Sequence, residues 1–310
     1  MTDSSPIKDV SDTAFMVAAY RALESERARP LFHDPLAGRL SGETGKKILQ
    51  NLPRRVFFGG WTVVIRTCVI DELIRWAILE GIDTVLNLGA GLDTRPYRLD
   101  LPGSLRWIEV DFPRVIEFKE GRLTGERPKC RLERLGLDLA DDSERRAFLS
   151  GLATSCEKIL VLTEGVIPYL KEEEVGSLAA DLRSRSGFVY WIADYFSPQT
   201  YEYRRRRGVD KIMKNAPFQF EPKDYFGFFR QLSWEPKQIR YLVEEGEKLK
   251  RPIPLPWPLK LKLKLVRLIL PAEKRASLKR LMGYVLFEPG CSIKAGNSFS
   301  RDAELASGKT

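Results

Sequence analysis

Residues 83–95 read Asp-Thr-Val-Leu-Asn-Leu-Gly-Ala-Gly-Leu-Asp-Thr-Arg, and this stretch decides the fold of the 310-residue chain. Its first half is an apolar, partly β-branched run, which predicts a strand covered on both faces of a sheet. Gly89 and Gly91 then predict a tight turn whose backbone can approach a ligand closely, because no Cβ stands in the way. Asp111 follows Gly91 by 20 residues, at the end of a second predicted strand. A carboxylate at that spacing is placed to accept hydrogen bonds from ribose hydroxyls.

This turn differs from a dinucleotide-binding turn in two ways. The third glycine of that fingerprint is replaced by Thr94, which weakens close helix packing beneath a pyrophosphate. Asp93 adds a carboxylate beside the turn, where it would repel a phosphate group. A nucleoside that has no phosphate and carries a cationic group fits better, and S-adenosylmethionine is such a ligand. The alternative is a strand-to-helix turn that binds nothing.

Residues 87–95, followed by Tyr97-Arg98-Leu99, closely resemble the leucine carboxyl methyltransferase family of class I S-adenosylmethionine-dependent methyltransferases. The resemblance covers about residues 10 to 195 and fades beyond them. Residues 21–27 resemble the bacterial branch, which includes carboxyl methyltransferases of aromatic polyketide pathways. Four further stretches match in the expected order: 13–22 with 34–37, Arg66-Thr67 with Asp71, 109–113, and 164–170.

The wider pattern alternates predicted strands with segments long enough for crossover helices. Such alternation implies a parallel, doubly wound α/β sheet that binds ligands across the carboxyl ends of its strands. Gly89, Asp111 and Glu164 all fall at such ends. The resemblance implies a class I methyltransferase (Rossmann-like) fold with a mostly parallel seven-stranded sheet. The predicted strands lie near 83–88, 105–110, 131–135, 158–163 and 187–193, with a final strand over 284–287.

We expect one structural domain with four segments. Residues 1–80 form an N-terminal helical lid, in which an apolar stripe of Trp61, Ile65, Val69, Leu73 and Ala77 predicts a helix over 61–79. Residues 81–195 form the S-adenosylmethionine-binding core. Residues 196–280 form a C-terminal substrate cap insertion rich in aromatic and basic residues, and 281–310 contain the final strand and a tail.

Three polar residues carry specific predictions about the cofactor. Arg66 beside the helical stripe could pair with the carboxylate of S-adenosylmethionine; the alternative is an ion pair with an acid such as Asp71. Asp138 follows the third strand, and the resemblance favours contact with the adenine amino group. Glu164 ends a buried strand and needs a partner, such as the cofactor's ammonium group. The predicted cofactor-binding residues are Arg66, Gly89, Ala90, Gly91, Asp93, Arg95, Asp111, Phe112, Asp138, Leu139, Glu164 and Gly165.

The predicted substrate is a small molecule that is anionic and aromatic. The cap contains many aromatic residues and the run Arg204 to Arg207, which could stack on a flat ring and hold an anion. The alternative is an ordinary helical cap with a solvated arginine face. Nucleic-acid binding ranks below both, because no RNA-binding module accompanies the arginines. The candidate substrate residues are Tyr20, Arg21, Tyr169, Tyr195 and Tyr203.

Charge, hydropathy and the cysteine and histidine content bear on membrane contact, metal sites and catalytic triads. The net charge of +9 is concentrated between Lys248 and Arg280, where eleven Lys and Arg face one acid. Within this segment, apolar and basic residues alternate with period two over 259–267, which predicts a strand. A basic amphipathic element of this kind could contact an acidic membrane surface, but a lid or a dimer contact is the preferred interpretation. We expect neither a signal peptide nor a transmembrane helix, because residues 1–9 do not lead from a basic region into an apolar core and no run of about 18 apolar residues occurs. Scattered cysteines and the single histidine, His33, argue against a metal site and a catalytic triad. We expect a cytoplasmic protein without a metal; the oligomeric state is not predicted.

The expected chemistry is O-methylation. A carboxylate acceptor, with a pKa near 4, is ionised at neutral pH and needs no base, whereas a phenol, with a pKa near 10, benefits from one. A single histidine therefore favours the carboxylate over a phenol or alcohol, and we name no catalytic residue. Two other classes stay open. An NAD(P)-dependent oxidoreductase would need an acid–base group that is not evident, and a non-catalytic adaptor would use the basic segment on membranes or nucleic acid.

Overall fold

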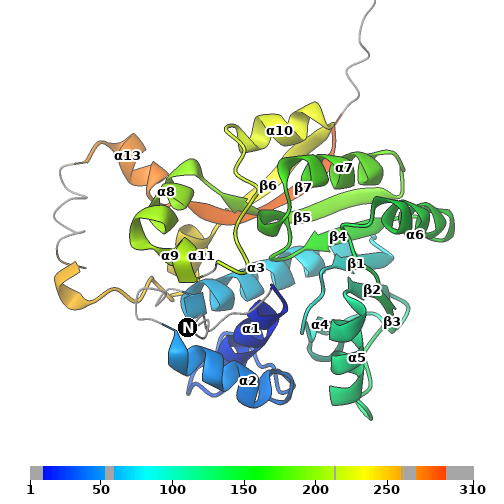
Figure 1. Cartoon of the computed structure of the whole chain (residues 1–310), viewed down its shortest axis with the longest axis horizontal. Helices are drawn as coiled ribbons and strands as arrows, with labels where there is room; N and C mark the ends of the chain where they lie inside the picture. Colours follow the sequence, from blue (N-terminus) through cyan, green and yellow to red (C-terminus); the bar gives the residue numbers. More distant parts are fainter. Residues whose placement is uncertain (1–9, 53–58, 213, 260, 262–269, 291–310) are drawn as a thin grey trace, which may run out of the picture.

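The computed structural model describes residues 10–52, 59–212, 214–259, 261 and 270–290. Its centre is a seven-stranded sheet in the order β3-β2-β1-β4-β5-β7-β6 (Figure 1). The first five strands pair in parallel, and β7 runs antiparallel to both β5 and β6. This topology confirms the predicted class I methyltransferase fold. The strands are β1 Thr84–Leu88, β2 Arg106–Asp111, β3 Arg131–Gly136, β4 Ile159–Thr163, β5 Phe188–Phe196, β6 Trp234–Tyr241 and β7 Met282–Pro289.

Helices cover both faces of the sheet. The apolar sides of α6, α7 and α10 pack on one face, and α3 and α11 pack on the other. The helices are α1 Val10–Ser25, α2 Ala37–Asn51, α3 Gly59–Leu79, α4 Arg95–Arg98, α5 Pro113–Arg122, α6 Asp142–Ser155, α7 Glu172–Arg183, α8 Pro198–Arg207, α9 Val209–Ile212, α10 Tyr225–Gln231, α11 Leu242–Lys248 and α13 Ala272–Ser277, with a short 3-10 turn at Ile167–Tyr169.

The predicted N-terminal lid divides into two parts. Helix α3 belongs to the core, because Ile65, Val69 and Leu73 are at most 1% exposed and join a cluster with Val85 and Trp107 of the sheet. Helices α1 and α2 pack on each other instead, beside the carboxyl ends of the strands. Among the described residues of the predicted lid, α1 and α2 lie beside these strand ends, and their role as a lid stays a prediction.

Helix α1 is fastened to the glycine turn through Arg21. The Arg21 Nη2 donates to the Leu92 carbonyl at 2.5 Å, and its Nε donates to Asp34 Oδ2 at 2.8 Å. Thr94 Oγ1 donates to the same Asp34 oxygen at 2.6 Å. Charge-assisted bonds of this kind are stronger than neutral ones. The lid is thus tied to the turn by a buried network.

The cap segment contains a strand that sequence analysis did not identify. Strand β6 lies at the edge of the sheet, where Pro236 is tolerated because an edge strand has unpaired donor positions. The strand predicted over 259–267 is wrong where the structure describes it: residues 257–259 and 261 are helical, and the rest of that segment lies outside the described residues. No helix in the described part of the chain is long and apolar enough to cross a membrane.

Candidate functional site

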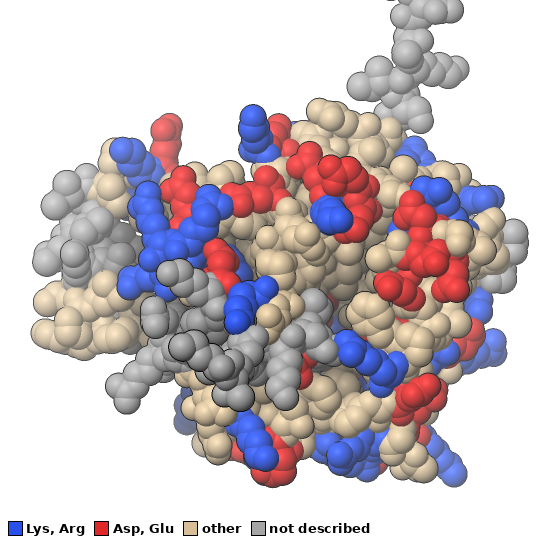
Figure 2. Space-filling model, viewed as in Figure 1, with Lys and Arg blue, Asp and Glu red and all other residues tan. Residues whose placement is uncertain are grey.

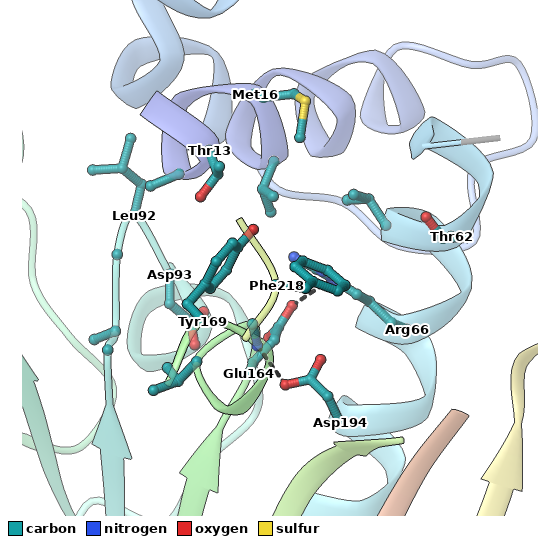
Figure 3. A pocket seen from close by; sticks show the side chains of 18 of the residues that line it. Thr13, Met16, Thr62, Arg66, Leu92, Asp93, Glu164, Tyr169, Asp194 and Phe218 are labelled. Carbon is teal, nitrogen blue, oxygen red and sulfur yellow. Dashed lines mark hydrogen bonds and ion pairs between the residues drawn. The ribbon is translucent and has the colours of Figure 1, made fainter. Parts of the chain in front are cut away.

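A cavity of about 510 Å³ lies at the carboxyl ends of β1, β2, β4 and β5, between α1 and α3 (Figure 3). Its lining comes from both the lid and the cap. Thr13 and Met16 reach it from α1, and Tyr203 and Arg204 reach it from α8. In the described part of the chain, no three residues of the His, Cys, Asp and Glu types gather as metal ligands.

The glycine turn forms one wall of this cavity. Gly89 and Gly91 have φ values of 69° and 48°, a region that side chains disfavour. A Cβ on Gly91 would lie 3.3 Å from the Ala14 Cβ of the lid, and one on Gly89 would overlap Cγ2 of Val166. The Gly89 and Ala90 amides both donate to the Val110 carbonyl, at 2.8 and 3.0 Å. Both glycines are required by conformation and by close packing.

Asp111 stands at the end of β2 and faces the turn. Its Oδ2 accepts from the Gly91 amide at 2.7 Å, and its Oδ1 accepts from the Phe112 amide at 2.7 Å. Burial raises the pKa of Asp111, although these two amides oppose the shift. Each carboxylate oxygen carries a further lone pair. The side chain is held rigidly and keeps acceptor capacity toward the cavity.

Glu164, at the end of β4, already has two protein partners. Arg66 Nε lies 2.9 Å from its Oε1, and Arg95 Nη1 donates to its Oε2 at 2.8 Å. Arg66 therefore pairs with Glu164 and not with Asp71, which is bound by Arg95 and Arg98. Burial lowers the pKa of Arg66, but nearby anionic groups outweigh it and raise that pKa overall. The buried Arg66 Nε has no hydrogen bond of standard geometry among the described residues, so its contact with Glu164 is an ion pair.

Arg95 is the buried hub beneath the turn. It is 2% exposed and donates to Asp71, Asp93 and Glu164 at 2.7, 2.7 and 2.8 Å. Burial raises the pKa of Asp93, but Arg95 and Lys119 outweigh it and hold that pKa well below its usual range. Asp93 also caps the following backbone, accepting from the Arg95 amide at 2.9 Å. Its charge is neutralised within the protein, so it does not face the cavity as a free anion.

Asp194, at the end of β5, is a second buried acid on the cavity wall. Its Oδ2 accepts from the Gly165 amide at 2.8 Å, and its Oδ1 accepts from the Tyr284 hydroxyl at 2.7 Å. Tyr284 is its cross-strand partner on β7. Burial raises the pKa of Asp194 to about 6, although Arg66, Tyr284 and Gly165 oppose the shift. This carboxyl group can therefore change protonation in the physiological range.

Aromatic rings from the core and the cap close the other end of the cavity. Tyr169 and Phe218 meet edge to face with centroids 5.2 Å apart, and Figure 3 places both rings above Glu164 and Asp194. The Arg204 guanidinium carbon lies 3.7 Å from the Phe218 ring centroid. Figure 2 shows basic side chains gathered over the region of α8 and α13. This end of the cavity is aromatic with an arginine at its edge.

Most predicted site residues meet at this cavity. Three lie outside the lining that the described residues form: Arg95 acts beneath the turn, and Tyr20 and Tyr195 pack elsewhere. Tyr195 instead stacks on Phe226, with centroids 5.3 Å apart. Arg21 lines the cavity, but its guanidinium donates to Asp34 and to the Leu92 carbonyl. The predicted residues that line the cavity are Arg66, Gly89, Ala90, Gly91, Asp93, Asp111, Phe112, Asp138, Leu139, Glu164 and Gly165, with Arg21, Tyr169 and Tyr203.

Asp194 and Tyr284 are among the lining residues that sequence analysis missed. Asp194 directly follows the predicted strand 187–193, the same signal that singled out Asp111 and Glu164, and could have been found by it. Tyr284 gives no such signal, because its place opposite Asp194 depends on the antiparallel pairing of β5 with β7.

Comparisons with known proteins agree with this geometry. A family model described as leucine carboxyl methyltransferase matches residues 14–183. A Streptomyces avermitilis protein, inferred to be an S-adenosyl-L-methionine-dependent methyltransferase, is 35% identical over 183 residues. That match covers 56% of this chain and spans 64% of the relative's length. A Mycobacterium marinum protein of the same description is 31% identical over 255 residues, or 73% of this chain and 82% of the relative.

Solved structures of other proteins are similar in fold. The crystal structure of an inferred methyltransferase from Thermobifida fusca superposes with a TM-score of 0.54 at 12% identity. The superposition covers 92% of this chain and 96% of that one. At this identity the likeness supports the fold alone.

Proposed function

This chain belongs to the leucine carboxyl methyltransferase family, and we propose that it is an S-adenosylmethionine-dependent methyltransferase that esterifies a carboxylate of a small, anionic, aromatic molecule. The observation that carries the proposal is one continuous cavity among the described residues, which joins the glycine turn and Asp111 to the aromatic rings and arginine of the cap. The family's description favours the carboxylate as the methylated group.

The residues present fit this cofactor. Asp111 keeps acceptor capacity for ribose hydroxyls, and the terminal nitrogens of Arg66 suit the carboxylate of an amino acid. Phosphates are disfavoured, because the carboxylates of Asp111 and Asp138 line the cavity. A cationic, phosphate-free nucleoside matches this set of groups.

The proposed reaction needs positioning more than acid–base chemistry. The bound cofactor supplies a methyl group on a sulfonium, which an acceptor oxygen takes by in-line displacement. Holding donor and acceptor in a reactive geometry can supply about 7–11 kcal/mol of the barrier. Tyr169 and Phe218 would orient the acceptor ring, and the α1 lid would exclude water. Because a carboxylate is already ionised, no side chain has to remove a proton.

The test is calorimetric titration of the full chain with S-adenosylmethionine. Asp111→Ala should weaken binding by at least about a hundredfold, because each lost hydrogen bond to a charged group is worth about 1.5–3 kcal/mol. Glu117→Ala is the matched control, since Glu117 is an exposed acid on the next helix and should leave affinity unchanged. Absence of binding by a folded wild-type protein would overturn the proposal.

A second candidate acceptor is a phenol or alcohol, and Asp194 is the observation that favours it. A buried carboxyl group with a pKa of about 6 on the cavity wall has the properties of a general base for a hydroxyl group. The proton would pass to an Asp194 oxygen as the acceptor oxygen takes the methyl group. A carboxylate acceptor would make no such use of Asp194.

Asp194→Asn separates the two acceptors. Methylation of a phenol should fall by about 10²–10⁴-fold, the usual contribution of a general base, whereas methylation of a carboxylate should change only a few-fold. In the wild type, a base must be ionised, so phenol methylation should fall below about pH 6, while carboxylate methylation should stay level.

Tyr284→Phe gives a further check on this acid. The Tyr284 hydrogen bond lowers the pKa of Asp194, so its loss should move the pH midpoint of phenol methylation upward. A midpoint that does not move would argue that Asp194 is not the titrating group. Cofactor affinity, measured for both variants, shows whether the site is intact.

A further inference from the structure

We infer that Arg204 binds a second anionic group of the acceptor, one that stays charged while another group of the same molecule is methylated. The acceptor is therefore an aromatic dianion, and the product is a monoester that keeps one negative charge. This inference rests on the proposed function and names its substrate class more closely.

Arg204 has unused hydrogen-bonding capacity at the cavity. Its side chain is 15% exposed, and both of its contacts with a described acid fall on one oxygen, Asp210 Oδ1: Nε donates at 3.2 Å, and Nη2 lies 3.1 Å away. The buried Nη2 has no hydrogen-bond partner among the described residues. A guanidinium has five N–H donors and favours bidentate contact with carboxylate-like anions. The Asp210 side chain is 42% exposed, so solvent screens that pair.

The surroundings of Arg204 suit an aromatic anion. Its guanidinium stacks on Phe218, which fixes the plane of its donors beside the cavity. Phe218 also contacts Tyr169 and Phe196, with centroids 5.2 and 5.3 Å away. Burial raises the pKa of Tyr169, and both Arg204 and Arg66 oppose that shift, so the Tyr169 hydroxyl feels both cations. The rings thus lie between the arginine of the cap and the arginine near the strand ends.

Charge balance argues that Arg204 holds a group that does not react. Arg66 already faces Glu164 and Asp194, whereas Arg204 meets only Asp210 among the described acids. A carboxylate loses its charge as it becomes an ester, so a cation bound to it stabilises the reactant more than the transition state. An arginine on the reacting group would slow the reaction. An arginine that binds a second, unreactive anion of the acceptor stabilises the reactant and the transition state equally.

The experiment compares benzoate with two dianions of the same ring, isophthalate and 3-sulfobenzoate. The full chain with S-adenosylhomocysteine is titrated with each acid by calorimetry, and methyl transfer to each is then measured. We expect the dianions to bind about tenfold to a hundredfold more tightly than benzoate, as a charge-assisted bidentate contact would give. Arg204→Gln should remove that difference and raise KM for the dianions, while benzoate and the cofactor bind as before.

Arg205→Gln is the matched control. Arg205 is the next residue of α8, has a side chain 54% exposed, pairs with Glu221, and lies outside the cavity lining of the described residues. It should keep the preference for dianions. Equal binding of benzoate and the dianions, failure of both dianions to bind, or loss of the preference in Arg205→Gln as well would overturn the inference. Failure of the proposed function is seen separately, as absence of cofactor binding or of any methyl transfer to a carboxylate.

Discussion

Arg95→Ala is expected to lower the free energy of unfolding by about 3–5 kcal/mol, the usual cost of removing one partner from a buried ion pair. Asp71 keeps Arg98, and Glu164 keeps Arg66. Asp93 is 6% exposed and loses its ion pair, keeping the Asn87 side-chain amide at 3.0 Å and the backbone amide of residue 95 at 2.9 Å. The loss of unfolding free energy therefore comes mainly from the buried Asp93 carboxylate, which no longer has an ion-pair partner. Urea unfolding monitored by circular dichroism measures it.

The loss of unfolding free energy in Arg95→Ala should depend on pH in a defined direction. In the wild type the pKa of Asp93 is lowered, so its stabilising contribution is present above the unfolded pKa, near 4, and is lost as the pH falls. The alanine variant lacks that contribution at every pH. The difference in unfolding free energy should thus be largest at neutral pH and shrink below about pH 4.

Two further variants make the Arg95 prediction specific. Arg106→Ala removes an arginine that pairs with Glu133 at the surface, and it should cost at most about 1 kcal/mol. Asp93→Asn added to Arg95→Ala should recover part of the loss, because no buried charge is then left unpaired. If Arg95→Ala cost no more than Arg106→Ala, the buried hub would not stabilise the fold as argued.

Gly89→Ala is expected to weaken S-adenosylmethionine binding by at least about a hundredfold, or about 2.8 kcal/mol. Its φ of 69° costs a side chain about 1–2 kcal/mol, and its Cβ would overlap Cγ2 of Val166. Relief of that overlap must move either the turn or Val166, and both line the cavity. Calorimetric titration gives the affinity, and thermal unfolding gives the accompanying loss of stability.

Gly125→Ala tests whether backbone strain alone, without an overlap such as that at Val166, weakens cofactor binding. Gly125 has a φ of 84°, and a Cβ there would meet no atom within 4 Å. That variant should lose stability through the same backbone strain but keep cofactor affinity. Val166→Ala added to Gly89→Ala should restore part of the affinity by removing the overlapping methyl group. Equal affinity losses in the Gly89 and Gly125 variants would show that the site does not depend on this contact.

Patterns close together in the chain predicted the strand ends that build the site. The apolar run before Gly89 and the spacing to Asp111 locate β1 and β2, since both signals are local. The carboxyl ends of parallel strands meet at one edge, so Gly89, Asp111 and Glu164 could be placed together without coordinates. The edge strand β6 escaped prediction because it is partly exposed and contains Pro236, so its sequence lacks a buried-strand pattern.

Periodicity, glycine conformation and short spacings were enough to predict the fold class, the glycine turn and the residue types at the strand ends. The pairing of charges, in contrast, became known from the three-dimensional structure. Glu164 is bound by Arg66 and Arg95, Arg21 is committed to the turn, and Asp194 meets Tyr284. Pairing energies depend on distance and burial in three dimensions, and these partners are separated by 69 to 98 positions along the chain.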